Sequence, residues 1–183
     1  MKTTNSIKQP SVPFRARLAG VSLIIACGLF IFSNVYVRWS TFPFNYRNFN
    51  SVYSGLWRRN VIYGTRVVSF KIKCSMERKS CVNLIIARIF MVLACITSGM
   101  GGICLSYLPS SKAKQRSLVY IIGLILAFLS FGYGLVGFLS GIIWIAQFER
   151  DAIGSAAICA LIGSLLSLTS AICAFFINSN KST

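Results

Sequence analysis

The chain has 183 residues, of which 55% are apolar and only 12% are charged. A soluble domain carries roughly twice that charged fraction, so the composition excludes an ordinary water-soluble protein. The net charge is +16 and only three residues are acidic. A basic excess often accompanies nucleic-acid binding, but no basic stretch here is long enough to fold alone, and we expect no nucleic-acid partner.

Four uncharged runs divide the chain, and they cover residues 18–37, 89–108, 117–148 and 152–177. A helix rises about 1.5 Å per residue, so roughly 20 apolar residues cross a hydrocarbon core about 30 Å thick. Loops and open sheets cannot do so, because lipid offers no partners to exposed backbone groups. The sequence therefore predicts an all-α membrane protein, a bundle of four transmembrane helices that makes one domain of residues 1–183.

The first run has a second interpretation, a cleaved signal peptide with Arg15 and Arg17 as its basic flank. The run is long for that role, and no Ala-x-Ala-like cleavage site follows it. We therefore expect a retained span.

Orientation depends on where the basic residues lie. With four spans both termini are on one side, which carries eight basic residues against ten on the other. The positive-inside rule gives most weight to residues beside the span ends. Arg15 and Arg17 precede the first span, Arg38 alone follows it, and the short second loop is almost purely basic. These positions favour cytoplasmic termini; the inverted topology, with the first loop against anionic cytoplasmic lipid, stays open.

The first loop, residues 38–82, is far too long for a simple connector. Residues 67–73 alternate between apolar and polar side chains, which predicts a half-buried strand. Residues 51–63 are rich in aromatic and β-branched residues, and Gly64 lies between the two runs. We expect a hairpin that turns near Gly64, and hence a small antiparallel sheet on the membrane surface.

Small residues recur four positions apart on the last two spans. Such spacing lets helix backbones approach closely in lipid. The pairs are Gly137 and Gly141, Ala156 and Ala160, and Gly163 and Ser167.

Two of the seven cysteines, Cys74 and Cys81, lie in the first loop. A disulfide between them would constrain the unfolded chain by roughly 2–3 kcal/mol. An extracellular location permits this bond and a cytosolic one does not. Two free thiols are the alternative, and the pair alone does not decide. The other cysteines lie in spans, where we expect apolar packing; for Cys104 and Cys173, near the cytoplasmic ends, palmitoylation is the alternative.

A wider pattern connects the first loop to the second span. Trp39 opens the loop, Gly55-Leu56-Trp57 lies within it, the cysteine pair follows, and Arg88 stands at the entry to the second span. With loops that are long, short and shorter, this pattern resembles the claudin superfamily over the whole chain. That superfamily includes the claudins, the peripheral myelin and epithelial membrane proteins, the lens intrinsic membrane protein and the calcium-channel gamma subunits. The resemblance implies a disulfide-closed extracellular first loop.

The chain departs from the family pattern in three places. The family usually places its first cysteine a few residues after Gly-Leu-Trp, where this chain has Asn60, so Cys74 would match the usual second cysteine and Cys81 would be a displaced partner. The third loop is shorter than in barrier-forming claudins. The C-terminal Lys-Ser-Thr lacks the hydrophobic last residue that a PDZ domain captures. The third loop and the C-terminus count against a strict tight-junction claudin, and the cysteine departure leaves the disulfide pairing open.

The chain lacks the side chains that most enzymes need. It has no histidine, and its carboxylates, Glu77, Glu149 and Asp151, are all in loops. A metal site or a paired-carboxylate mechanism therefore lacks ligands and bases, and a cysteine nucleophile lacks a histidine base. The glycines of residues 99–102 lack the strand and helix context of a phosphate loop. We expect neither an enzyme nor a cofactor.

The first loop has nine basic residues and one acidic residue, a net charge of +8. We expect a claudin-like adhesion or barrier protein at plasma-membrane cell contacts, such as tight junctions, that associates with itself in cis or in trans. The fixed charge would enrich anions and repel cations over about 8 Å. The charged residues singled out are Arg58, Arg59, Arg66, Lys71, Lys73, Arg78 and Lys79.

Two other functions stay open. One is an auxiliary subunit of an ion channel or receptor, like the calcium-channel gamma subunits, and the other is a general membrane-organising protein of the myelin or epithelial type. In each case we expect Trp39 and Trp57 at the membrane interface, where amphipathic rings sit. Arg88 is expected at the outer end of the second span, in contact with loop carbonyls or lipid headgroups.

Overall fold

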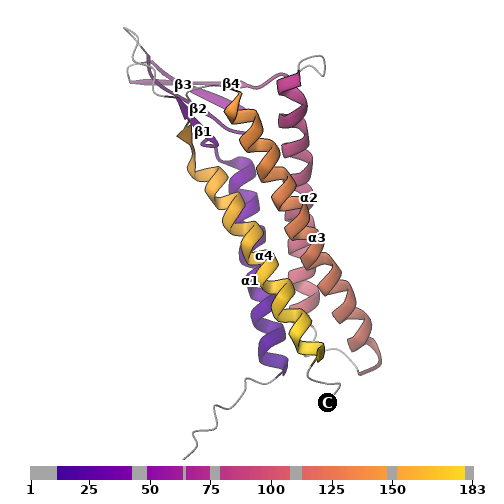
Figure 1. The fold of residues 1–183 in the computed structure, drawn as a ribbon. Helices are drawn as coiled ribbons and strands as arrows, with labels where there is room; N and C mark the ends of the chain where they lie inside the picture. Colours follow the sequence, from indigo (N-terminus) through magenta and orange to yellow (C-terminus); the bar gives the residue numbers. More distant parts are fainter. Residues whose placement is uncertain are drawn as a thin grey trace, which may run out of the picture.

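The computed structural model describes residues 12–42, 49–63, 65–74, 79–107, 113–147 and 152–179. Within these ranges the chain forms four long helices and one small antiparallel sheet at one end of the helix bundle (Figure 1), as the sequence predicts. The helices are α1 (Val12–Val35), α2 (Lys79–Tyr107), α3 (Ala113–Ala146) and α4 (Ser155–Ser179).

Each of these four helices is long and apolar enough to cross a bilayer. Only 28–39% of each apolar stretch is buried inside the protein. The outward faces carry large aliphatic side chains such as Ile25, Ile103 and Leu118, which are 53%, 66% and 63% exposed. An aqueous protein rarely exposes so continuous an apolar surface. The architecture is consistent with a multi-pass membrane protein.

The helices pack closely through small residues. At the crossing of α1 and α2, a Cβ atom on Gly20 would lie 2.8 Å from the Ser106 nitrogen and 3.0 Å from the Gly102 carbonyl oxygen. A Cβ atom on Gly102 would in turn lie 3.1 Å from the Gly20 carbonyl oxygen, so both glycines let the two helices approach closely. The small residues predicted to permit such contacts are all buried: Gly137, Gly141, Ala156, Ala160, Gly163 and Ser167.

The ends of all four helices differ from the predicted span boundaries, and three of these differences lie next to the sheet. α2 begins at Lys79, ten residues before the uncharged run, because Arg88 remains inside the helix and directs its side chain to the sheet. α1 ends at Val35, and α4 begins at Ser155 because residues 152 and 153 form a strand. Charge marks where a side chain must meet polar partners, and a helix continues past such a residue wherever partners exist.

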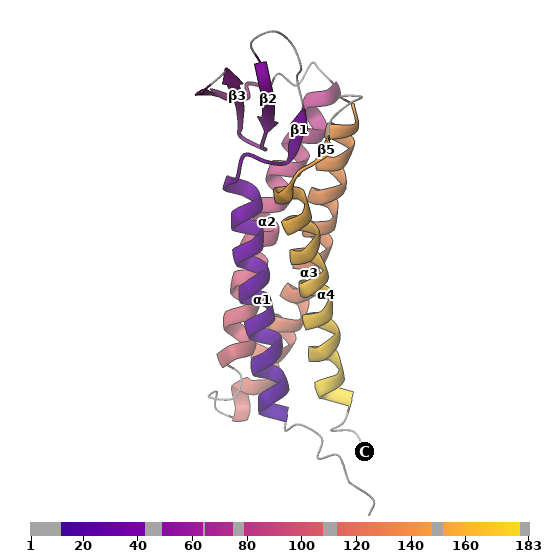
Figure 2. The same ribbon diagram turned by 90° about the vertical axis from the view of Figure 1, so that its left-hand side faces the viewer.

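The sheet has the strand order β4-β3-β2-β1-β5, and every neighbouring pair is antiparallel (Figure 2). The predicted hairpin is confirmed by β3 and β4, which pair from Arg58↔Lys71 to Tyr63↔Arg66. Residues 51–63 do not form one strand, because the Gly55-Leu56-Trp57 turn divides them. The strands are β1 (Ser40–Phe42), β2 (Phe49–Ser54), β3 (Arg58–Tyr63), β4 (Arg66–Lys71) and β5 (Ala152–Ile153).

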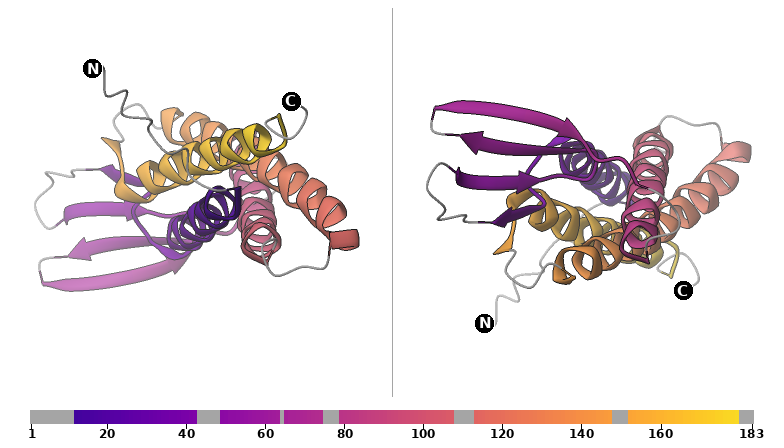
Figure 3. Two further views of the ribbon diagram at one scale, coloured as in Figure 1. Left: turned by 90° about the horizontal axis from the view of Figure 1, so that it is seen from below. Right: turned by 90° about the horizontal axis from the view of Figure 1, so that it is seen from above.

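The prediction that β4 is half-buried is wrong. All six of its residues are exposed, with Val67 60% and Phe70 50% accessible. The alternating pattern identified a strand, but β4 is the edge of the sheet and extends beyond the helices (Figure 3). An exposed edge strand offers unpaired backbone groups to a further strand.

We expect Gly20→Ala to lower the free energy of unfolding by about 1–3 kcal/mol, because overpacking forces the α1 and α2 backbones apart. Gly28 in the same helix is the matched control, since a Cβ atom there meets nothing within 4 Å. Gly28→Ala should leave stability unchanged or slightly raised. Thermal unfolding of both purified variants in detergent measures the difference; equal stability would contradict the packing at this crossing.

Candidate functional site: the braced sheet at the end of the bundle

Trp39 joins the sheet to the interior of the bundle. Its side chain is fully buried, and its indole N–H donates to the Ser33 carbonyl at 2.6 Å. The ring packs against Gly141 of α3, where any Cβ atom would overlap it. Trp39 thus anchors the sheet inside the protein: Gly141 leaves a space in α3 for the indole, and the Ser33 carbonyl accepts from its N–H. Its predicted depth at the membrane interface stays a prediction.

The Gly55-Leu56-Trp57 motif forms the turn between β2 and β3. Gly55 is required by close backbone approach, because a Cβ atom there would lie 2.8 Å from the Val37 Cα. Its N–H donates to the Arg58 carbonyl at 2.8 Å, which closes the turn. Leu56 is fully buried in the core below the sheet, whereas Trp57 remains 46% exposed. Gly55 thus permits the tight turn, Leu56 anchors the turn in the core, and Trp57 presents an exposed aromatic ring.

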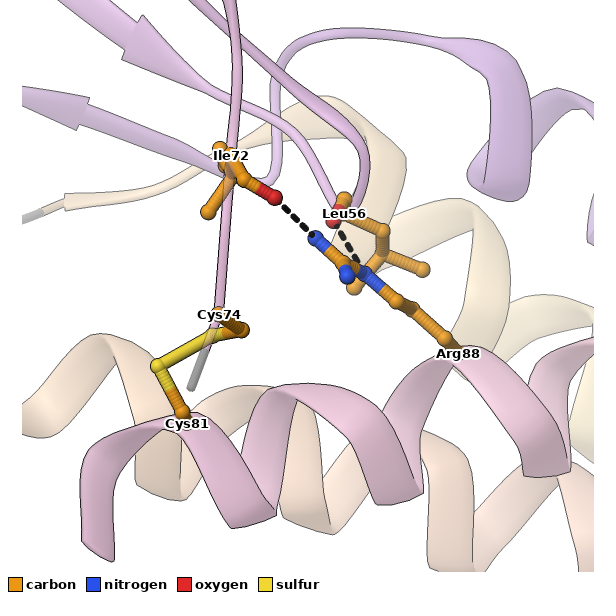
Figure 4. Close-up of a disulfide and its surroundings, with 5 residues drawn as sticks. All are labelled: Leu56, Ile72, Cys74, Cys81 and Arg88. Atoms are coloured by element: carbon orange, nitrogen blue, oxygen red, sulfur yellow. Dashed lines mark hydrogen bonds between the residues drawn. A yellow bond between two sulfur atoms is a disulfide. The ribbon is translucent and has the colours of Figure 1, made fainter. Parts of the chain in front are cut away.

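Arg88 of α2 connects two segments of the first loop (Figure 4). Its Nε donates to the Leu56 carbonyl at 2.7 Å, and its Nη2 donates to the Ile72 carbonyl at 3.4 Å. The guanidinium also lies 4.8 Å from the centre of the Trp57 ring, within cation–π range. The Ile72 N–H donates in turn to the Trp57 carbonyl at 3.1 Å. Arg88 contacts loop carbonyls as the sequence predicts.

A disulfide joins Cys74, just after β4, to Cys81 in the first turn of α2, with Cα atoms 5.4 Å apart (Figure 4). The disulfide ties the segment after β4 to α2, close to Ile72, whose carbonyl accepts from Arg88. Asn60, which stands where the family pattern expects a cysteine, lies on β3 and accepts a hydrogen bond from Ser69 of β4 at 2.5 Å. The pairing of β3 with β4 thus has a polar cross-strand contact at this position.

The basic residues are divided between the two faces of the sheet. Residues that pair directly across antiparallel strands share a face, so Arg58 and Lys71 lie on one face. Arg59, which donates to the Ser54 hydroxyl at 3.0 Å, and Arg66 lie on the other. Lys73 is exposed after β4. Arg78 and the side chain of Lys79 lie outside the described residues.

Sequence reasoning missed the contribution of the third loop. β5 pairs with β1, and a Cβ atom on Gly154 would overlap the Arg38 carbonyl. The Gly154 N–H donates to the Trp39 carbonyl at 2.7 Å, and the Ala156 N–H at the start of α4 donates to the Arg38 carbonyl at 3.0 Å. Gly154 followed by Ser155 before an apolar run is a helix-start signal that could have placed this boundary.

The cysteines within the helices are packed rather than paired covalently. Cys27 of α1 and Cys95 of α2 have sulfur atoms 3.7 Å apart, and the Cys27 thiol donates to the Cys95 carbonyl at 3.4 Å. Cys104 is partly buried and Cys173 is exposed. Among the described residues, no group of three or more histidine, cysteine or carboxylate side chains could hold a metal ion.

No protein-family model matches the chain, and no curated protein matches it in sequence.

We expect Arg88→Lys to lower the free energy of unfolding by about 1–3 kcal/mol, because an ammonium keeps the charge but loses the planar fork that serves both carbonyls. Arg66→Lys, at an exposed position of the same sheet, should change it by less than about 0.5 kcal/mol. Thermal unfolding in detergent gives both values. Equal effects of the two exchanges would contradict the role of Arg88 as a brace.

Proposed function

We propose that this chain is a multi-pass plasma-membrane protein, claudin-like in type, whose sheet is extracellular and acts at cell–cell contacts as a barrier or adhesion surface. The observation that carries the proposal is a basic sheet fixed to one end of an apolar four-helix bundle by Arg88 and the Cys74–Cys81 disulfide. A surface meant to meet a neighbouring molecule benefits from such rigidity, because less conformational entropy is lost on contact.

The disulfide supports an outward orientation. Structural disulfides persist in oxidising compartments and are rare in the cytosol. The sheet lies at the end of the bundle opposite to the start of α1 and the end of α4 (Figure 1). An extracellular sheet therefore goes with cytoplasmic termini, which the position of Arg15 and Arg17 also favours.

We expect Cys74 and Cys81 to resist a membrane-impermeant maleimide in intact cells and to react with it after an impermeant reductant is added. The measurement uses a variant whose other five cysteines are replaced by alanine or serine. Labelling without reductant would show free outward thiols. Labelling only after permeabilisation would place the sheet in the cytoplasm and contradict the proposal.

The charge of the sheet supports a selective barrier. Arg58 and Lys71 on one face, and Arg59 and Arg66 on the other, give both faces the same sign. In a narrow aqueous path between cells, fixed positive charge enriches anions and excludes cations within a screening length of about 8 Å. The backbone edge of β4 is also free to pair with another copy of the chain.

A cell layer expressing the protein is expected to favour chloride over sodium, and neutralising Arg58, Arg59, Lys71 and Lys73 to glutamine should abolish that preference. The matched control exchanges arginine for lysine and lysine for arginine at the same four positions, which keeps the charge. Dilution potentials across the layer report the selectivity. Unchanged selectivity in the glutamine variant, with normal surface delivery, would contradict the charge-barrier mechanism.

The second candidate is an auxiliary subunit of an ion channel or receptor. The like-charged pair formed by Arg58 and Lys71 favours it, because an acidic extracellular face of a partner would relieve their repulsion. Purification in mild detergent distinguishes the two. A stoichiometric channel or receptor supports the auxiliary role, whereas self-association enriched at cell contacts supports the first proposal.

A further inference from the structure

The face of the sheet that carries Arg58 and Lys71 turns back toward the helices. Tyr53, Ile62 and Val67 of this face line a cavity of about 460 Å³ together with Phe32 and Val35 at the end of α1. Figure 3 shows strands β2 to β4 extending sideways past α1, so no helix covers this face along most of its length. It overhangs the apolar surface of the first helix.

A second cavity, of about 480 Å³, lies between α1 and α2 below the Gly55-Leu56-Trp57 turn. Its walls are mostly apolar, with Ile31 of α1 and Val92 and Ile96 of α2, and Arg58 stands at the sheet end of it. The lining also includes Asn34 and Cys95. The two cavities share residues 35–37, so together they surround the end of α1. Both volumes are in the range of small-molecule sites, roughly 300–1,000 Å³.

Positive charge is concentrated where these cavities meet the sheet. Arg38 lines the first cavity, with its guanidinium 4.9 Å from the Tyr53 ring centre and 5.8 Å from that of Tyr36. Arg58 lines the second and pairs directly across from Lys71. Like charges in such a position repel one another. The described part of the chain contains no carboxylate that could relieve this repulsion, since all three acidic residues of the protein lie outside it.

We propose that this underside of the sheet binds a phospholipid from the adjoining leaflet through its headgroup phosphate. An acyl chain lies in the aliphatic groove between α1 and α2, and the headgroup phosphate lies against Arg58 and Lys71, with Arg38 on the neighbouring side of α1. A guanidinium forms paired, charge-assisted hydrogen bonds to phosphate, and the phosphate neutralises the like-charged pair. The inference rests on the proposed membrane placement of the helices, since only a bilayer brings lipid to this groove.

Two other occupants fit the observations less well. A sterol fills an aliphatic groove but carries no anionic group for three cations. A free phosphate satisfies the cations but makes no use of the aliphatic walls. A phospholipid uses both the apolar groove and the charges above it.

The test is native mass spectrometry of the full-length protein, purified in detergent and supplied with phosphatidylglycerol or phosphatidylcholine. We expect stronger retention of phosphatidylglycerol, and about fivefold weaker retention by Arg58→Gln, because one basic residue at an anionic lipid surface contributes about 1 kcal/mol. Arg66→Gln is the matched control, an exposed arginine of the same sheet on its opposite face, and should change retention by less than about twofold.

A second pair of variants tests the apolar groove without changing charge. Val35→Trp and Ile96→Trp each place a bulky ring in the second cavity from an exposed position, 74% and 51% accessible, and should abolish retention while the unfolding temperature stays near that of the wild type. Two substitutions keep the test valid if one variant fails to fold.

Several outcomes would overturn the proposal: equal effects of Arg58→Gln and Arg66→Gln, competition by inorganic phosphate with no effect of the tryptophan variants, displacement by a sterol, or no preference for phosphatidylglycerol. Carbonate extraction of membranes from the same cells tests membrane placement separately. A protein that stays in the membrane fraction but shows no lipid preference overturns the lipid site alone. A protein released by carbonate overturns the membrane placement itself.

Discussion

The bond from the Arg88 guanidinium to the Leu56 carbonyl, 2.7 Å long, is the contact on which the arrangement of the sheet depends. It fixes the β2–β3 turn against α2, and the same side chain reaches Ile72 beyond β4. A charged group in an otherwise apolar helix is costly unless polar partners surround it, so helix and loop stabilise one another. The Cys74–Cys81 disulfide beside it also ties the end of the β4 segment to α2, while the buried side chains of Trp39 and Leu56 anchor the sheet in the core of the bundle.

Helix number and class were predictable because bilayer crossing is a strong constraint: it requires long uncharged runs, and four occur in the sequence. The β3–β4 hairpin was predictable because period-two alternation and a glycine between two runs are local signals. β5 was not, because two residues carry no period and their pairing with β1 is set by the return of α4 to the end of α1. Burial of β4 also failed, since alternation does not reveal an edge position.

The residues of the candidate site likewise include some that could be predicted from the sequence and some that could not. Arg88 was recognisable because the family pattern has an arginine at the entry to the second span, and a charge there needs polar partners such as the carbonyls of the nearby loop. The burial of Trp39 was not predicted, because an indole beside a span end can either face the membrane interface or pack inside the protein. The deciding residue, Gly141, lies about a hundred positions away and leaves the space that the ring fills. Such complementarity between distant segments has no signature in either segment alone.

The interactions that hold β4 in the sheet help to explain why the sheet carries basic residues. β4 is exposed along its whole length, so its position depends on backbone pairing with β3, the Ile72–Trp57 hydrogen bond and the disulfide. Arg58 opposite Lys71 adds nothing to that support and opposes it. A feature that breaks a local rule without a gain in the fold is expected where function demands it. We therefore infer that the basic rows serve a partner outside the chain, whether an anion in solution, an acidic protein face or a lipid phosphate.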